Sequence, residues 1–98
     1  MGVFDYVRVK YPLPVEGAND INYQTKSLER DLDQYEIRED GSLWHEVRGG
    51  DVPRWVQVNH HGALSFHGTL GEGRWIDWTA LYDCGELVNI ILKRHTAS

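Results

Sequence analysis

The sequence predicts a single all-β domain, 1–98, made mostly of antiparallel strands. Its 98 residues are a normal size for one domain and too few for two ordinary ones. Four Trp and five Tyr make the chain rich in aromatic side chains, which suit a pleated, half-buried surface. Helical character is confined to 26–34, a stretch too short to be stable alone, so we expect at most one short helical turn there.

The N-terminal third predicts two strands and an extended connector. Residues Val3–Lys10 alternate weakly between apolar and polar and indicate a strand, and Ile21–Thr25 indicates a second, shorter one. Between them, Pro12 and Pro14 each remove a backbone donor and favour extended geometry in the preceding residue. We therefore expect a proline-rich connector and a loop before the second strand.

A repeated turn signal organises the rest of the chain. Three times, a residue pair followed by Gly separates two alternating runs, at Glu39–Gly41, His60–Gly62 and Asp83–Gly85. A three-residue hairpin loop places its last residue in the left-handed region, which favours Gly. Each such loop sets a register that collects apolar residues on one face. The predicted pairs on that face are Ile37/Leu43, Tyr35/His45, Val58/Leu64, Val56/Phe66, Ala80/Val88, Trp78/Ile90 and Ile76/Leu92.

These hairpins predict an antiparallel meander of about seven strands, forming a curved sheet, a half-barrel or a small sandwich. Gly49–Asp51 turns the chain between the first and second hairpins, and Gly68–Gly73 forms a longer, Gly-rich loop between the second and third. From residue 35 onward, we expect strands near 35–38, 42–48, 54–59, 63–67, 74–82 and 86–94.

Composition and charge argue against several classes of function. With 15 acidic and 10 basic residues, the net charge of −5 disfavours a nucleic-acid-binding surface. Apolar runs are too short to span a membrane, and the first ten residues lack the pattern of a signal peptide, so we expect neither. Cys84 is the only cysteine, which precludes an intrachain disulfide and fits a reducing compartment. We therefore expect a cytoplasmic protein without nucleic-acid or membrane partners.

An aromatic surface is the main candidate site. The predicted register places three of the four Trp opposite the core, whereas Trp78 faces the core. Contiguous apolar surface marks contact sites, and Trp is favoured at binding hot spots. Trp75 and Lys93 would form a cross-strand cation–π pair. If a second layer or a second copy covers this face, the same Trp side chains belong to a core. The predicted binding surface consists of Trp44, Trp55, His67, Trp75 and Lys93.

Histidines provide an alternative, metal-binding site. His60, His61 and His67 could supply imidazole ligands to zinc, and Cys84 could supply a thiolate. The first two histidines sit in a turn and point apart, and no metal motif has the required spacing. Asp77 could act as one carboxylate of a hydrolase, although its partner cannot be named. We therefore expect no catalytic residue, no metal and no cofactor, with the three histidines as the alternative.

Several short segments resemble small proteins encoded by phages and prophages. They are the opening Met1–Val7, then Tyr11–Pro14, Gln24–Leu28, Tyr35–Ile37, Asp40–Leu43 and Gly85–Leu87. These segments are distributed along most of the chain. That family has no established activity. The resemblance implies a phage or host cytoplasm and an accessory role, and it assigns no functional residue.

The sequence leaves three functions open. The first is a non-enzymatic binding protein, phage-derived, that acts on a host protein or a small ligand. The second is a small hydrolase that depends on a metal or on acid/base catalysis. The third is a structural homodimer closed edge to edge or through the aromatic face.

Overall fold

The computed structural model describes residues 4–28, 32–47 and 50–95 of the chain. Across these residues the chain forms eight strands in one mostly antiparallel sheet, which confirms the all-β prediction. No helix in this part of the chain is long and apolar enough to cross a membrane. The elements are β1 (Asp5–Val9), the 3-10 turn η1 (Ala18–Asp20), β2 (Asn22–Thr25), β3 (Gln34–Ile37), β4 (Leu43–Val47), β5 (Arg54–Val58), β6 (Gly62–Leu70), the 3-10 turn η2 (Gly71–Gly73), β7 (Arg74–Asp83) and β8 (Glu86–His95).

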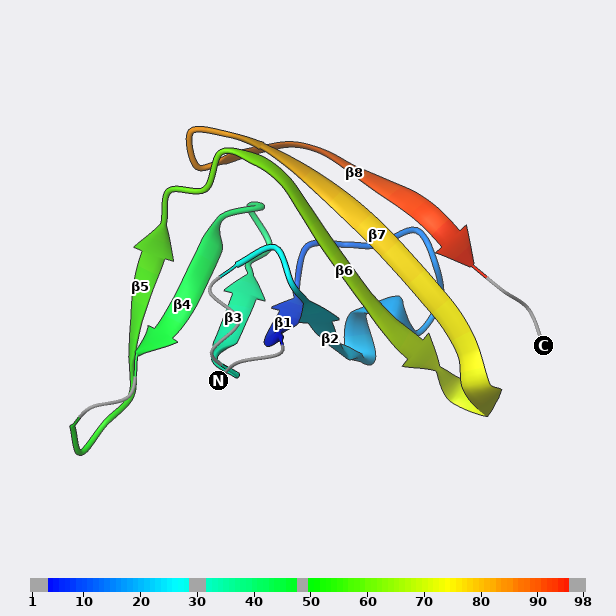
Figure 1. The fold of residues 1–98 in the computed structure, drawn as a ribbon, viewed down its shortest axis with the longest axis horizontal. Coiled ribbons are helices and arrows are strands. Elements are labelled where there is room, and N and C mark those ends of the chain that lie inside the picture. Colours follow the sequence, from blue (N-terminus) through cyan, green and yellow to red (C-terminus); the bar gives the residue numbers. More distant parts are fainter. Residues whose placement is uncertain (1–3, 29–31, 48–49, 96–98) are drawn as a thin grey trace.

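The sheet consists of two three-stranded meanders with the N-terminal strands between them. Its order is β5-β4-β3-β1-β2-β6-β7-β8 (Figure 1). Strand β1 pairs antiparallel with β2 and parallel with β3, and β2 pairs with β6. The predicted meander is therefore correct within each half of the sheet, but the two halves are not joined by the second predicted hairpin.

The predicted hairpin around His60–Gly62 is wrong. Val58 lies opposite Leu43 of β4, and Leu64 lies opposite Ala80 of β7, so β5 and β6 belong to different halves of the sheet. Alternation shows which residues face the core, but it fits any neighbour that shares that face and does not identify the neighbour. The predicted pairs that the sheet does not form here are Val58/Leu64 and Val56/Phe66.

The first hairpin has the predicted loop and register. The backbone N–H of Arg38 donates to the carbonyl of Ser42 at 2.8 Å, which closes a loop of three residues. Gly41, the last of the three, has a φ of 90°, in the left-handed region that favours Gly. The confirmed pairs are Ile37/Leu43, Tyr35/His45 and Glu36/Trp44.

The third hairpin forms at the predicted place with a different register. Its loop has two residues, because Asp83 pairs with Glu86. Cys84 and Gly85 have φ values of 49° and 90°, as a type I′ turn requires. Next to the turn the register is one residue from the predicted one, so Leu87, expected outside, packs against the core, and Val88, expected on the core face, is 66% exposed. A bulge at Val88 then moves the register a second residue, which returns Ile90 and Leu92 to their predicted face. The sheet pairs Ala80/Ile90, Trp78/Leu92 and Ile76/His95 in place of the predicted Ala80/Val88, Trp78/Ile90 and Ile76/Leu92.

Two predicted connections also differ. Strand β6 continues to Leu70, so the expected Gly68–Gly73 loop is reduced to the single turn η2. The expected helical turn near 26–34 is not formed by its described residues, and 29–31 lie outside the described residues. Val3 and Gly49, which belong to a predicted strand and a predicted turn, also lie outside them.

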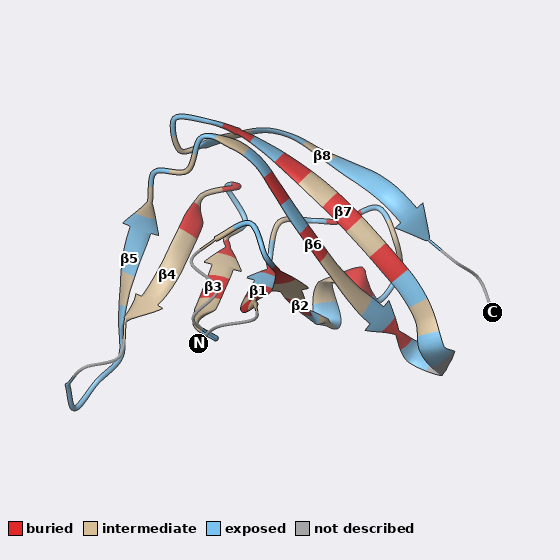
Figure 2. Ribbon diagram, in the orientation of Figure 1, coloured by how far each residue is buried: buried red, intermediate tan, exposed pale blue. Residues whose placement is uncertain are grey.

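The core fills the space inside a bent sheet. Figure 1 shows β3–β5 and β6–β8 as two limbs of an arch, with β1 and β2 between them. Buried positions run along the middle strands, whereas the edge strands β5 and β8 are mostly exposed (Figure 2). The largest fully buried side chains are Trp78, Tyr23, Phe66, Ile37, Leu43, Leu64 and Ile76.

The two limbs meet where the β3–β4 turn approaches the β7–β8 hairpin. The hydroxyl of Tyr82 donates to the carbonyl of Gly41 at 2.7 Å, and a Cβ atom added to Gly41 would lie 2.8 Å from Leu87 Cβ. The N–H of Gly85 donates to the carbonyl of His60 at 2.8 Å. These contacts fix the positions of the turns that border the candidate sites.

Candidate functional site

The predicted binding surface is divided between two separate parts of the sheet. Trp44 lies on β4 and Trp55 on β5, whereas His67 lies on β6, Trp75 on β7 and Lys93 on β8. Strands β3, β1 and β2 lie between β4 and β6. The five residues therefore form no single patch, and each group needs its own description.

The first group, Trp44 and Trp55, also contains Arg38, which is not among the predicted site residues. The guanidinium carbon of Arg38 lies 4.0 Å from the ring centroid of Trp44 and 5.9 Å from that of Trp55. Trp44 pairs with Gln57 and Trp55 with Glu46, so the two indoles are diagonal neighbours on one face of the β4–β5 pair. We call Arg38, Trp44 and Trp55 the tryptophan–arginine cluster. Both indoles are partly exposed.

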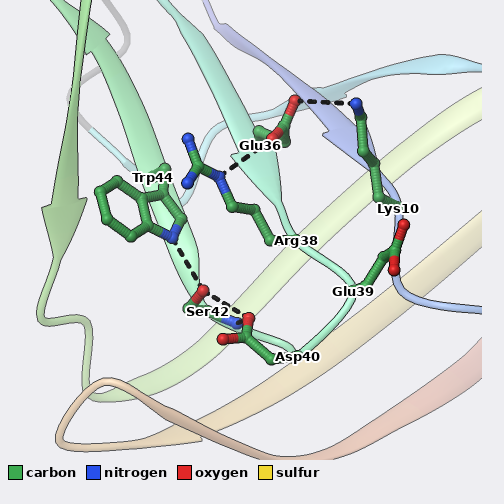
Figure 3. A pocket seen from close by; sticks show the side chains of 7 residues that line it. All are labelled: Lys10, Glu36, Arg38, Glu39, Asp40, Ser42 and Trp44. Carbon is green, nitrogen blue, oxygen red and sulfur yellow. Dashed lines mark hydrogen bonds and ion pairs between the residues drawn. The ribbon is translucent and has the colours of Figure 1, made fainter.

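Polar contacts hold this cluster in one arrangement. The Nε of Arg38 donates to a carboxylate oxygen of Glu36 at 3.2 Å, and the Nζ of Lys10 lies 3.9 Å from the other oxygen. The indole N–H of Trp44 donates to the hydroxyl of Ser42 at 2.8 Å. Figure 3 shows the guanidinium between the Trp44 ring and the Glu36 carboxylate. The cation is thus placed over the ring by residues of the same hairpin.

An open depression of about 460 Å³ adjoins the cluster. Hydrogen bonds from the hydroxyl and amide of Ser42, at 2.6 and 3.0 Å, lower the pKa of Asp40, so this exposed carboxyl is charged at neutral pH. Glu39 is exposed beside it. The depression offers charged groups of both signs and one aromatic face; its lining residues are Lys10, Glu36, Arg38, Glu39, Asp40, Ser42 and Trp44.

The second group consists of a stacked pair, His67 and Trp75, and of Lys93, which is not paired with either of them. The rings of His67 and Trp75 lie 4.7 Å apart at 17°, on adjacent strands of the outer face. Lys93 falls at the second bulge of β8, between the partners of Asp77 and Trp78. The predicted opposition of Trp75 and Lys93 is therefore wrong, because the bulges shift β8 along β7.

The three histidines considered for metal binding make separate contacts. The Nε2 of His60 lies 3.2 Å from the carbonyl of Ala63, His61 contacts the β7–β8 hairpin, and His67 stacks on Trp75. They do not converge on one point. Among the described residues, the histidine, cysteine and acidic side chains that do converge are His61, Asp83 and Cys84.

Arg38 is the residue of the first group that sequence reasoning misses. The signal was present, because the predicted first hairpin places Arg38 opposite Ser42, two positions from Trp44 on the same face. An arginine at that offset from an outer-face tryptophan is within reach of its ring.

Comparisons with protein-family models, curated proteins and solved structures find no match to this chain.

Proposed function

We propose that this chain is a non-enzymatic interaction protein that binds a protein partner through the tryptophan–arginine cluster. The observation that carries the proposal is the Arg38 guanidinium, 4.0 Å over a partly exposed Trp44 ring with Trp55 beside it. Trp and Arg are strongly enriched at binding hot spots. The ion pair with Glu36 orders the cluster before binding, which lowers the entropy cost of association.

The charges around the cluster favour a partner with a basic segment. Glu39 and Asp40 are exposed at the rim of the depression, and the whole chain has a net charge of −5. Complementary charge at a rim raises the rate of encounter and excludes acidic partners. We further propose a host protein in a bacterial cytoplasm as the partner, a view supported by the resemblance of the opening residues to phage-encoded proteins.

The test compares matched tryptophan variants. Bacterial lysate is passed over the immobilised chain, captured proteins are quantified by mass spectrometry, and the Kd of the purified partner is measured by calorimetry. Trp44→Ala and Trp55→Ala should each weaken that Kd by about 30-fold, which corresponds to a hot-spot loss of about 2 kcal/mol. Trp75→Ala, at the other end of the sheet, should leave it within about threefold.

Melting temperatures separate binding from folding in this comparison. Both cluster variants should melt within a few degrees of the unsubstituted protein, since their indoles are partly exposed. The proposal is overturned if Trp75→Ala weakens the binding of the same partner as much as the cluster variants do. It is also overturned if Trp55→Ala lowers the melting temperature sharply, since that result would make the indole part of the core.

The edge of the sheet supports a second candidate function, a structural homodimer. Strand β8 has ten residues, pairs with β7 on one side, and has no described strand on the other. Val88 on this strand is 66% exposed and Leu92 is 39% exposed. An antiparallel pair of β8 strands centred on Ile90 would oppose Glu86 to Arg94 and Val88 to Leu92. Long apolar edges associate readily, and this one is complementary to itself in charge.

Light scattering and a charge swap test the homodimer. The measured mass should rise toward that of two copies as protein concentration increases. Arg94→Glu should reduce the association by placing like charges opposite each other, and combining it with Glu86→Arg should restore it. A monomeric mass at every concentration, or a double variant no better than the single one, would contradict this arrangement.

A further inference from the structure

The connection that leads into β6 meets the β7–β8 turn at the tip of that hairpin. His61 lies in the connection between β5 and β6, whereas Asp83 and Cys84 lie at the turn between β7 and β8. The backbone hydrogen bond from the N–H of Gly85 to the carbonyl of His60, at 2.8 Å, holds this connection against the turn. All three side chains of His61, Asp83 and Cys84 are exposed, so an ion in solvent can reach them.

The donor atoms are spaced as ligands of one small cation. The Nδ1 of His61 lies 3.6 Å from an oxygen of Asp83 and 4.0 Å from the Sγ of Cys84, and the three donor atoms lie within 4.8 Å of one another. Zinc bonds of about 2.0 to 2.3 Å in a tetrahedron place ligand atoms roughly 3.3 to 3.8 Å apart. Small rotations of exposed side chains would bring these atoms to those separations.

The ring nitrogen in the cluster is the acceptor nitrogen of the imidazole. The backbone N–H of Cys84 donates to the Nδ1 of His61 at 3.2 Å, so this nitrogen acts as an acceptor and the ring proton lies on Nε2. A neutral imidazole with a free lone pair is the form that ligates metals. A bound ion would replace the hydrogen bond from the Cys84 amide at this lone pair.

The same geometry disfavours a catalytic triad. In a nucleophile–histidine–acid triad, the nucleophile and the carboxylate contact opposite nitrogens of the ring, so that a proton can pass through it. Here the thiol and the carboxylate both lie beside Nδ1. The arrangement therefore suits convergence on one ion and does not suit a proton relay.

We propose that His61, Asp83 and Cys84 bind Zn²⁺ through three protein ligands, with a fourth position open to solvent. The thiol releases its proton to water as the Zn–S bond forms, and the thiolate and carboxylate charges balance the two charges of the ion. A thiolate and an imidazole select zinc over calcium and magnesium, which prefer oxygen ligands. Of the three ligands, Cys84 also lines a surface depression of about 410 Å³, together with Gln57, Asn59 and Glu86.

Metal titration of protein without a histidine tag tests the site. Zinc affinity is measured by competition with a chromophoric chelator, and Co²⁺ is added as a spectroscopic substitute. One Zn²⁺ should bind per chain, Co²⁺ should give a thiolate-to-cobalt absorption band, and Ca²⁺ should not compete. His61→Gln, Asp83→Asn and Cys84→Ser should each weaken zinc binding by at least about tenfold, since even loss of an outer partner of a ligand costs that much.

His60→Gln is the matched control, because His60 is the neighbouring turn histidine and contacts Ala63 instead of the cluster. It should bind zinc as the unsubstituted protein does. Equal losses in His60→Gln and His61→Gln, or unchanged affinity in Cys84→Ser, would overturn the proposal. If a variant changes the circular dichroism spectrum, the Co²⁺ spectrum of the unsubstituted protein decides, and the absence of a thiolate band there rejects the site.

Discussion

The hydroxyl of Tyr23 links two of the largest buried side chains to the N-terminal loop. It donates to the carbonyl of Ala18 at 2.7 Å and accepts from the indole N–H of Trp78 at 3.2 Å. Tyr23→Phe removes the hydroxyl that pairs with the Ala18 carbonyl and the Trp78 indole N–H. We therefore expect the free energy of unfolding to fall by about 1 to 3 kcal/mol in urea denaturation. Tyr6→Phe, on the outer face, should change it by less than about 0.5 kcal/mol. Equal effects would argue against this network.

Buried tyrosines also predict how stability depends on pH. Burial raises the pKa of Tyr23 to about 12 and also raises the pKa of Tyr82, from a value near 10 in the unfolded chain. Below about pH 10 both states hold these protons and the stabilisation is complete. As the pH rises from about 10 to 12, the unfolded chain releases them first, so stability is lost.

Urea midpoints measured from pH 8 to 12 check this dependence. The midpoint should be nearly constant up to about pH 9.5 and then decline, and the decline should be shallower in Tyr23→Phe because one shifted proton is gone. A decline of the same steepness in both proteins would show that Tyr23 titrates normally.

Among the elements, the hairpin loops differ in how far the sequence determines them. The turns at Gly41 and Gly85 both form where the Gly signal predicts them, and around Gly41 alternation also predicts which side chains face the core. The third loop nevertheless has two residues, because Cys84 adopts positive φ. Leu87 and Val88 therefore lie on the faces opposite to those predicted, and the predicted faces return only after the bulge at Val88. Between the two bulges the register is shifted by two residues, which leaves the faces of Ile90 and Leu92 unchanged, so alternation alone could not detect this part of the shift.

Pairings between distant strands left no local signal. Strand β1 pairs in parallel with β3, and Thr25 of β2 pairs with Phe66 of β6, without any turn connecting them. Both Leu43 and Leu64 suit Val58 as a neighbour on the core face; the turn signal favours Leu64, whereas the sheet pairs Val58 with Leu43. The lack of a local signal for strand pairing also affects the candidate site. Alternation placed Trp44 and Trp55 on the outer face, but the arrangement of their rings around Arg38 depends on the β4–β5 register.

The close packing of the β3–β4 turn predicts that a substitution at Gly41 lowers the free energy of unfolding. Gly41→Ala adds a Cβ atom 2.8 Å from Leu87 Cβ in a backbone conformation with φ of 90°. Strain and overpacking should together lower the free energy of unfolding by about 2 kcal/mol or more, measured in urea. Gly50→Ala is the control, since its Cβ would meet nothing within 4 Å, and it should change stability by less than about 0.5 kcal/mol. Similar losses in both would contradict this contact.

For the whole molecule, stability should decrease from the middle of the sheet to its edges. Val7 of β1 and Phe66 of β6 are fully buried, whereas β5 and β8 are largely exposed. Hydrogen exchange followed by nuclear magnetic resonance should therefore show the slowest amides in β1, β6 and β7, opening only with global unfolding. Amides of β5 and the outer half of β8 should exchange at least about tenfold faster. Equal protection of the β5 and β1 amides would contradict this gradient, because it would mean that the edge strand β5 is shielded from solvent.

The insertion of β1 and β2 between the two meanders has a consequence for synthesis on the ribosome. These strands leave first, yet Thr25 pairs with Phe66, which is translated 41 residues later. At about 5 to 20 residues per second, the strand pair waits roughly 2 to 8 s for that neighbour. During this interval Val7 and Tyr23 have no complete core to enter. Of the described strands, the pair translated first therefore waits for a neighbour translated much later, and its exposed apolar side chains make the nascent chain prone to aggregation at this stage.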